Sequence, residues 1–112
     1  MASYAFTIPV KPGKVGAWKK YIAEMTGPRK ADLKASRKGA GLTKEKVWLQ
    51  STPMGDYAVV YWEAADISNV FKQFLTSTDP FDKWFREKIL MEIHAMDPAA
   101  PPPPMNESIL DA

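Results

Sequence analysis

Regular alternation of large apolar side chains with small or polar ones predicts the strands of this chain. Tyr4, Phe6 and Ile8 occupy every second position near the start, which is the pattern of a strand with one buried face. The segments 45–50 and 57–63 are rich in β-branched and aromatic residues and flank the turn formers of 52–56. These two segments therefore predict a β-hairpin.

Apolar residues spaced three and four positions apart predict helices elsewhere in the chain. Three such series occur: Val15, Trp18, Ile22 and Met25; Ile67, Val70, Phe71, Phe74 and Leu75; and Phe81, Phe85, Ile89 and Ile93. Gly27-Pro28 should interrupt the first helix, because proline removes an amide donor, and a second helical piece over about 29–38 should follow. Asp66 is a predicted helix cap, and Asp79-Pro80 has the cap-then-proline order of another helix start.

The end of the chain is dominated by proline. Residues 98–104 should form an extended polyproline segment, since proline fits neither a helix interior nor a central strand. Residues 107–111 are long enough for a short edge strand that would complete a β-α-β-β-α-β order, or they fray as a terminus. We expect one α+β domain over 1–97 and an arm over 98–112 that contributes to a dimer.

Composition narrows the class of protein. With 112 residues, 46% of them hydrophobic and 25% charged, the chain is expected to fold as one domain. A net charge of +2 is weak for a nucleic-acid-binding protein. No apolar run approaches membrane-spanning length, and no secretory leader is recognisable at the start. We therefore expect no nucleic-acid or membrane partner and a cytoplasmic location.

Few residues are available for catalytic chemistry. His94 is the single histidine and cysteine is absent, so no metal site, cofactor or catalytic triad is expected. His94 is a candidate general base, or it serves only to interact with the dipole of a helix end. Glu63 is the second candidate, because it continues the Tyr57, Val59 and Tyr61 face of a strand and would be partly buried if that face looks into the interior.

Aromatic residues offer either a ligand pocket or a core and interface. The residues proposed to line a pocket are Trp18, Trp48, Tyr61, Trp84 and Phe85. The segment 29–46 is also basic, with seven lysines and arginines against two acidic residues. It is either an anion-binding surface or the solvated face of a helix and its loop.

The order of these segments resembles the dimeric α+β barrel superfamily, and within it the L-rhamnose mutarotase-like proteins. The resemblance rests on Lys11-Pro12-Gly13 after the first strand, on Gly41 before the hairpin, and on Ser77-Thr78-Asp79 leading to Trp84-Phe85. It implies a ferredoxin-like βαββαβ fold with an antiparallel sheet, two sheets packed face to face in a homodimer, and a small pocket in each protomer. Some members of the superfamily bind haem, which would make His94 a candidate haem ligand.

The catalytic residues of the mutarotases are not matched. The family's helix carries a tyrosine and, four residues later, a proton-transferring histidine, and those positions hold Trp18 and Ile22 here. We therefore expect a dimeric barrel with an aromatic pocket for a small molecule. The sequence assigns no reaction to this pocket. The alternative is a structural or regulatory dimerisation module without a ligand. A pocket lined by Trp18, Trp84 and Glu63 would favour the first hypothesis, and a filled interior the second.

Overall fold

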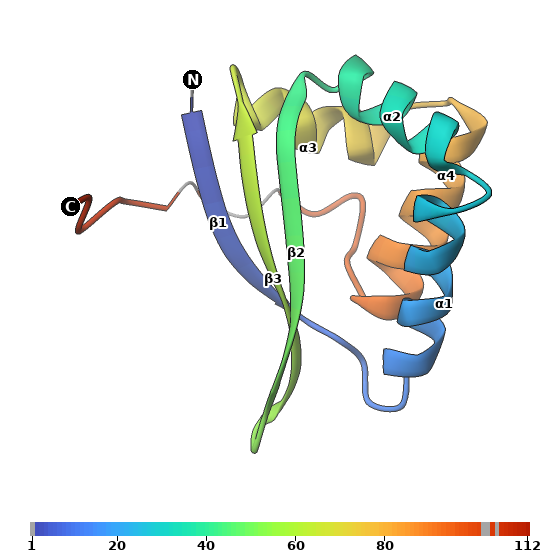
Figure 1. The fold of residues 1–112 in the computed structure, drawn as a ribbon, viewed down its shortest axis with the longest axis horizontal. Helices are drawn as coiled ribbons and strands as arrows, with labels where there is room; N and C mark the ends of the chain where they lie inside the picture. Colours follow the sequence, from blue (N-terminus) through green and yellow to red (C-terminus); the bar gives the residue numbers. More distant parts are fainter. Residues whose placement is uncertain (1, 102–103, 105) are drawn as a thin grey trace.

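One antiparallel sheet carries helices on a single face. In the computed structural model, which describes residues 2–101, 104 and 106–112, the strands β1 (Ala2–Pro9), β2 (Leu42–Thr52) and β3 (Gly55–Ala64) lie in the order β1-β3-β2. The helices are α1 (Val15–Thr26), α2 (Lys30–Gly39), α3 (Ile67–Thr76), α4 (Pro80–Phe85) and the π-helix η1 (Arg86–Ile93). Figure 1 shows α1, α2 and α4 on one side of the sheet and no helix on the other. The molecule is an α+β fold whose strand order is compatible with a ferredoxin-like topology.

Local sequence signals set the bounds of the helices as predicted. The Asp66 carboxylate accepts the Asn69 amide at the start of α3, and Asp79 accepts the Phe81 amide at the start of α4 with Pro80 in the first helical position. These caps satisfy amides that have no partner within the helix. The predicted hairpin is also confirmed.

The predicted break between the first two helices is confirmed at Gly27. Its amide donates to the Ala23 carbonyl at 3.0 Å and closes the last turn of α1. A β-carbon at this position would lie 2.9 Å from the same carbonyl oxygen, so a larger residue would force the turn apart. Glycine followed by Pro28 therefore ends one helix and lets the chain redirect into α2.

The core lies between the sheet and the helices. Its sheet side comes from alternate residues of each strand, which point to the same face, and the predicted buried face of α4 and η1 is confirmed. The buried apolar residues are Tyr4, Val10, Trp18, Met25, Ala40, Leu42, Ala58, Val60, Trp62, Ala64, Ile67, Val70, Phe71, Phe74, Phe81, Phe85, Ile89 and Ile93.

The C-terminal arm differs from expectation. Residues 106–112 form no strand, and Pro98 to Ala100 make a turn; the extended polyproline prediction falls partly on 102–103, outside the described residues. Two hydrogen bonds join the arm to β1 in place of a strand ladder. The side-chain amide of Asn106 donates to the Ala5 carbonyl, and the Tyr4 hydroxyl donates to the Pro104 carbonyl at 3.1 Å. Prolines cannot donate to a ladder, so the chain reaches this edge with side-chain contacts.

The π-helix was not predicted. Phe81, Phe85, Ile89 and Ile93 are spaced four residues apart, and this spacing fits an α-helix as well as a π-helix. The pattern therefore gives no sign of the wider π turn. Across the described parts of the chain, no helix has the length and apolar character needed to cross a membrane.

Candidate functional site

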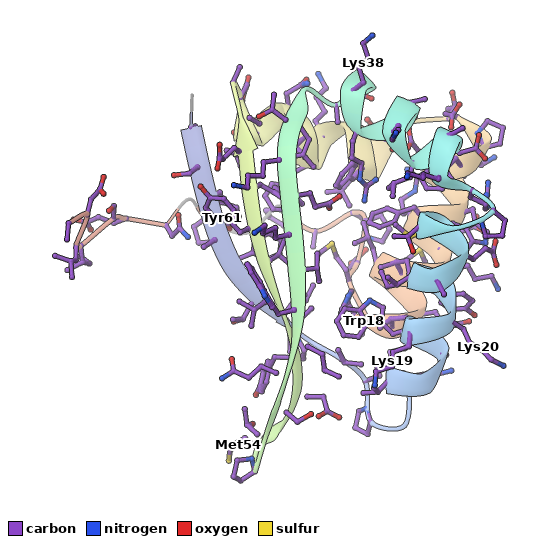
Figure 2. The ribbon with its side chains drawn as sticks, viewed as in Figure 1. Trp18, Lys19, Lys20, Lys38, Met54 and Tyr61 are labelled. Atoms are coloured by element: carbon purple, nitrogen blue, oxygen red, sulfur yellow. The ribbon has the colours of Figure 1, made fainter. Side chains whose placement is uncertain are left out.

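A cavity of about 290 Å³ lies between the inner face of the sheet and the helices. Figure 2 shows Trp18 on the side of α1 that faces the sheet, with Lys20 on the opposite side of the helix. The cavity is lined by Phe6, Ile8, Trp18, Ile22, Met25, Thr26, Leu33, Arg37, Glu45, Val47, Ala58, Val60, Trp62, Phe71, Phe74, Phe85, Ile89, Leu90, His94 and Met96. Its volume is at the lower end of the range of ~300–1,000 Å³ found for ligand pockets.

The strand periodicity explains the sheet wall of the cavity. Ala58, Val60 and Trp62 alternate along β3 and all point inward. Ala58 is fully buried between Ile8 of β1 and Leu49 of β2 in the strand register. Ala58 is the smallest residue of the cavity lining.

The π-helix places His94 on the wall of the cavity. The His94 amide donates to the carbonyl of Ile89 at 3.2 Å, five residues earlier. This spacing stacks Ile89 and His94 on one side, whereas an α-helix would turn them well apart. Both residues line the cavity. Single π turns inserted in helices are often found at functional sites.

The Pro9 carbonyl fixes the tautomer of the His94 imidazole. Its Nδ1 lies 2.9 Å from the carbonyl oxygen of Pro9, and a carbonyl can only accept, so Nδ1 carries the proton. Burial lowers the pKa of His94 below its ordinary value, and the bond to Pro9 opposes this in part. The Trp18 indole meets the imidazole edge to face, with ring centres 5.7 Å apart. Nε2 is thus the nitrogen available to a molecule in the cavity.

A buried ion pair forms the other polar part of the wall. Nε of Arg37 donates to the Glu45 carboxylate at 2.9 Å, and the Trp62 indole N–H reaches the same carboxylate at 3.3 Å. The Arg37 guanidinium also lies over the rings of Phe74 and Phe85, 4.4 Å from each centre. Cation–π contacts of this kind stabilise a desolvated guanidinium.

A series of hydrogen bonds through hydroxyl and carboxylate groups supports the Arg37 guanidinium. Its Nη1 donates to Ser36 Oγ at 3.2 Å, and Ser36 in turn donates to the buried carboxylate of Asp82. The second oxygen of Asp82 accepts from Ser77 at 2.7 Å. Residues from α2, α4 and the loop before α4 therefore fix the orientation of the guanidinium.

A second hollow lies between α1 and β2, next to the cavity. This hollow of about 280 Å³ shares Trp18, Ile22 and Val47 with the cavity and is bordered by Lys19, Ala23 and Leu49. Val47 is partly exposed at this position.

Three of the candidate residues line the cavity: Trp18, Phe85 and His94. Trp84 lies outside the cavity lining, where its ring packs edge to face against Tyr21, with centres 5.9 Å apart, and beneath the Arg29 guanidinium. This assigns Trp84 a packing contact between α1 and α4.

The remaining candidates, Trp48, Tyr61 and Glu63, lie on the helix-free face of the sheet. The Tyr61 hydroxyl donates to the Glu63 carboxylate at 2.7 Å, and Lys44 Nζ lies 3.9 Å from the same group. The bond to Glu63 raises the pKa of Tyr61. The expectation that Glu63 would face the interior was conditional on this face of β3 looking inward, and the face looks outward.

Arg37, Glu45 and Trp62 were not proposed as site residues. Glu45 had a sequence signal, because it shares the period-2 face of Val47 and Leu49 and is the one charged residue in that apolar series. Arg37 had none, since it stands in a basic run among exposed lysines. Its burial depends on Glu45, which lies eight residues further along the chain.

Comparisons with protein-family models, with curated proteins and with solved structures found no match to this chain. In the described part of the chain, histidine and carboxylate side chains form no group of three or more that could hold a metal ion. The geometry of the cavity is therefore the main guide to function.

Proposed function

We propose that the protein binds a small, uncharged and mainly apolar molecule in the cavity between the sheet and α1, α2 and η1. The observation that carries this proposal is a cavity of about 290 Å³ whose wall is mostly hydrocarbon and aromatic, interrupted by a few polar groups. Walls of this composition are typical of small-molecule sites, where a few polar groups fix the orientation of the ligand. Transfer of an apolar molecule from water into such a space is favourable.

The charge of the wall favours a neutral ligand. Arg37 and Glu45 are the charged residues of the lining, and each is paired with the other. An anionic ligand would have to compete with Glu45 for the guanidinium and would lose its own hydration. An uncharged aromatic or alicyclic molecule needs neither step.

Binding of 2-methoxynaphthalene, a neutral aromatic probe, tests this proposal. Trp18 and Trp62 line the cavity, so the probe should change the tryptophan fluorescence, and calorimetry would give its affinity. Ala58→Phe should weaken binding at least about tenfold because the ring occupies the cavity. Ala31→Phe on the exposed side of α2 is the matched control. Equal binding by the wild type and Ala58→Phe, or no binding by the wild type, would contradict the proposal.

We also propose that two copies associate through the helix-free face of the sheet. Trp48, Tyr57, Val59 and Tyr61 form an aromatic and apolar centre on this face, and the Trp48 side chain is 50% exposed in the single chain. Lys46 and Glu63 add both signs of charge, which suits an interface that pairs with a copy of itself. Such packing would give the dimeric α+β barrel.

The resemblance to the mutarotase-like proteins supports the location of the ligand pocket in the cavity. It does not support the family's proton-transfer reaction in this chain. Trp18 and Ile22 occupy the positions of the family's tyrosine and histidine, and both line the cavity. Ile22 has no group that can transfer a proton, so we do not extend the family's reaction to this chain. The alternative, a dimerisation module without a ligand, draws support from the apolar sheet face but leaves the cavity unexplained.

A further inference from the structure

We propose that His94 is the proton acceptor of the cavity, and that the natural ligand is a neutral aromatic weak acid that presents its acidic proton to Nε2. This inference rests on the proposed function, because it names the class of molecule that the cavity takes. It goes further by assigning the one proton-transferring group and the atom that carries out the transfer.

The first argument is the geometry around the imidazole. The Pro9 carbonyl occupies Nδ1 and fixes the proton there, so the lone pair remains on Nε2. No hydrogen bond from the described residues reaches Nε2, and no fully buried side-chain nitrogen or oxygen lacks a partner in that part of the chain. Nε2 therefore keeps access to the cavity that His94 lines.

The second argument compares the three ionisable groups of the wall. The Glu45 carboxylate accepts from Arg37 and from the Trp62 indole, so both of its oxygens are already engaged by donors of the wall. Arg37 is a cation and cannot accept a proton. His94 is the remaining group of the wall that can accept a proton, because Nδ1 is bonded to the Pro9 carbonyl and Nε2 keeps its lone pair.

Charged groups next to His94 do not share this role. On η1, Glu92 accepts from the Tyr21 hydroxyl of α1 at 2.6 Å and lies in the field of Lys11, Lys14 and Lys88. These residues do not line the cavity. Glu92→Gln is therefore a matched control, because Glu92 lies near the end of η1, two residues before His94.

The ligand class follows from two parts of the wall, the Nε2 atom of His94 and the apolar side chains beside it. A phenol or an activated carbon acid can donate its proton to Nε2 while its ring lies against Trp18, Ile89 and Leu90. An acid that is already ionised would gain nothing from a neutral imidazole. A ligand without an acidic proton would make no hydrogen bond to Nε2 and would lack the polar contact that fixes its orientation.

Imidazole NMR tests the contact without any substitution. His94 is the only histidine, so in untagged protein the ring ¹⁵N signals come from it alone. Addition of 2-naphthol should shift the Nε2 signal and leave the Nδ1 signal nearly unchanged, whereas 2-methoxynaphthalene should bind without the Nε2 shift. If both probes bind and neither moves Nε2, the inference is overturned while the proposed function stands. If neither binds, both are overturned.

Proton abstraction is tested with 5-nitrobenzisoxazole, a carbon acid that reports on bases in apolar sites. The base takes the C–H proton, the electron pair of that bond completes a nitrile, and the N–O bond breaks to leave a coloured phenolate. Wild-type protein should accelerate this reaction, with a rate that falls as acid protonates His94. His94→Gln should lose at least about tenfold of the acceleration, and Glu92→Gln should keep it. Equal rates in the wild type and His94→Gln, or no acceleration although 2-naphthol binds, would overturn the role of His94.

Discussion

The two faces of the sheet use the same strands for different purposes. On β3, Ala58, Val60 and Trp62 are buried beneath the helices, while Val59 and Tyr61 alternate with them and are only partly covered. The inner face borders a cavity whose polar groups are paired or held by neighbouring residues. The outer face carries Trp48, Tyr57 and Tyr61, and no helix covers it (Figure 1).

This difference separates ligand binding from association. An ionisable group changes its proton affinity when it is buried, and burial lowers the pKa of His94 on the inner side in this way. On the outer face, the Glu63 side chain remains 34% exposed and has Tyr61 and Lys44 as partners. Chemistry is therefore expected on the inner side and self-association on the outer side.

The largest effect is expected from Val59→Lys on the outer face. Val59 lies on the central strand, paired with Thr7 and Trp48, so a symmetric dimer would bring two lysines together near its axis. We expect dimer affinity to fall about 10³-fold, because burial of like charges costs several kcal/mol. Sedimentation equilibrium measures this, with Lys38→Glu on α2 as the control. A wild type that is monomeric at micromolar concentration would contradict the proposed dimer.

On the inner face, loss of Glu45 should destabilise the fold. Glu45→Ala leaves Arg37 buried without its ionic partner, which costs about 3 kcal/mol in the free energy of unfolding. We place the cost at the lower end of the usual range because the Glu45 side chain is 22% exposed. The double variant Arg37→Met/Glu45→Leu should be more stable than Glu45→Ala. Urea denaturation measures both, and an unchanged stability of Glu45→Ala would show that the pair is not needed.

Removal of residues 106–112 should affect association more than folding. Ile109 and Leu110 are 86% and 84% exposed in the single chain, so they are available to cover apolar surface on a second copy. Their loss should weaken the dimer at least about tenfold. The truncation keeps Pro104, whose carbonyl accepts from Tyr4. If dimer affinity is unchanged, the arm does not take part in the interface.

Sequence periodicity predicted which residues share a face but not which face meets the helices. It grouped Tyr57, Val59, Tyr61 and Glu63 correctly, and the strand register agrees. Both faces of β3 carry large apolar residues, so hydrophobicity alone does not tell the inner face from the outer one. Glu63 was therefore considered for the interior, whereas the charged group found there is Glu45.

Two parts of the site depend on contacts that no local pattern records. The cavity is lined by residues of all three strands and of α1, α2, α3, α4 and η1, so no single stretch of sequence encodes it. The position of His94 depends on the π turn after Ile89 and on the carbonyl of Pro9, 85 residues earlier in the chain. Caps and turns, in contrast, depend on neighbours in sequence, and Asp66 and Asp79 were predicted correctly.

Acid should destabilise the wild type through His94. Since burial lowers the pKa of His94 in the folded protein, the unfolded chain binds a proton at a higher pH than the folded one does. The contribution to stability is therefore present above the ordinary pKa of histidine and is lost as the pH falls below it. His94→Gln should show a shallower loss of melting temperature between neutral and mildly acidic pH. Parallel curves for the wild type and the variant would contradict a desolvated His94.

The smallest effect is expected with L-rhamnose, whose anomer exchange the protein should not accelerate above buffer. Exchange needs a proton at the ring oxygen and removal of another from the anomeric hydroxyl, and Ile22, which lines the cavity, has no group that could transfer either proton. The cavity also presents few polar groups, so the hydroxyls of a sugar would be buried without partners, at a cost of about 1–3 kcal/mol each. Saturation-difference NMR on the wild type, His94→Gln and Glu63→Gln measures the exchange. Acceleration that disappears in His94→Gln would make the inner face a sugar site, and acceleration that disappears in Glu63→Gln would move the chemistry to the outer face and reverse the comparison.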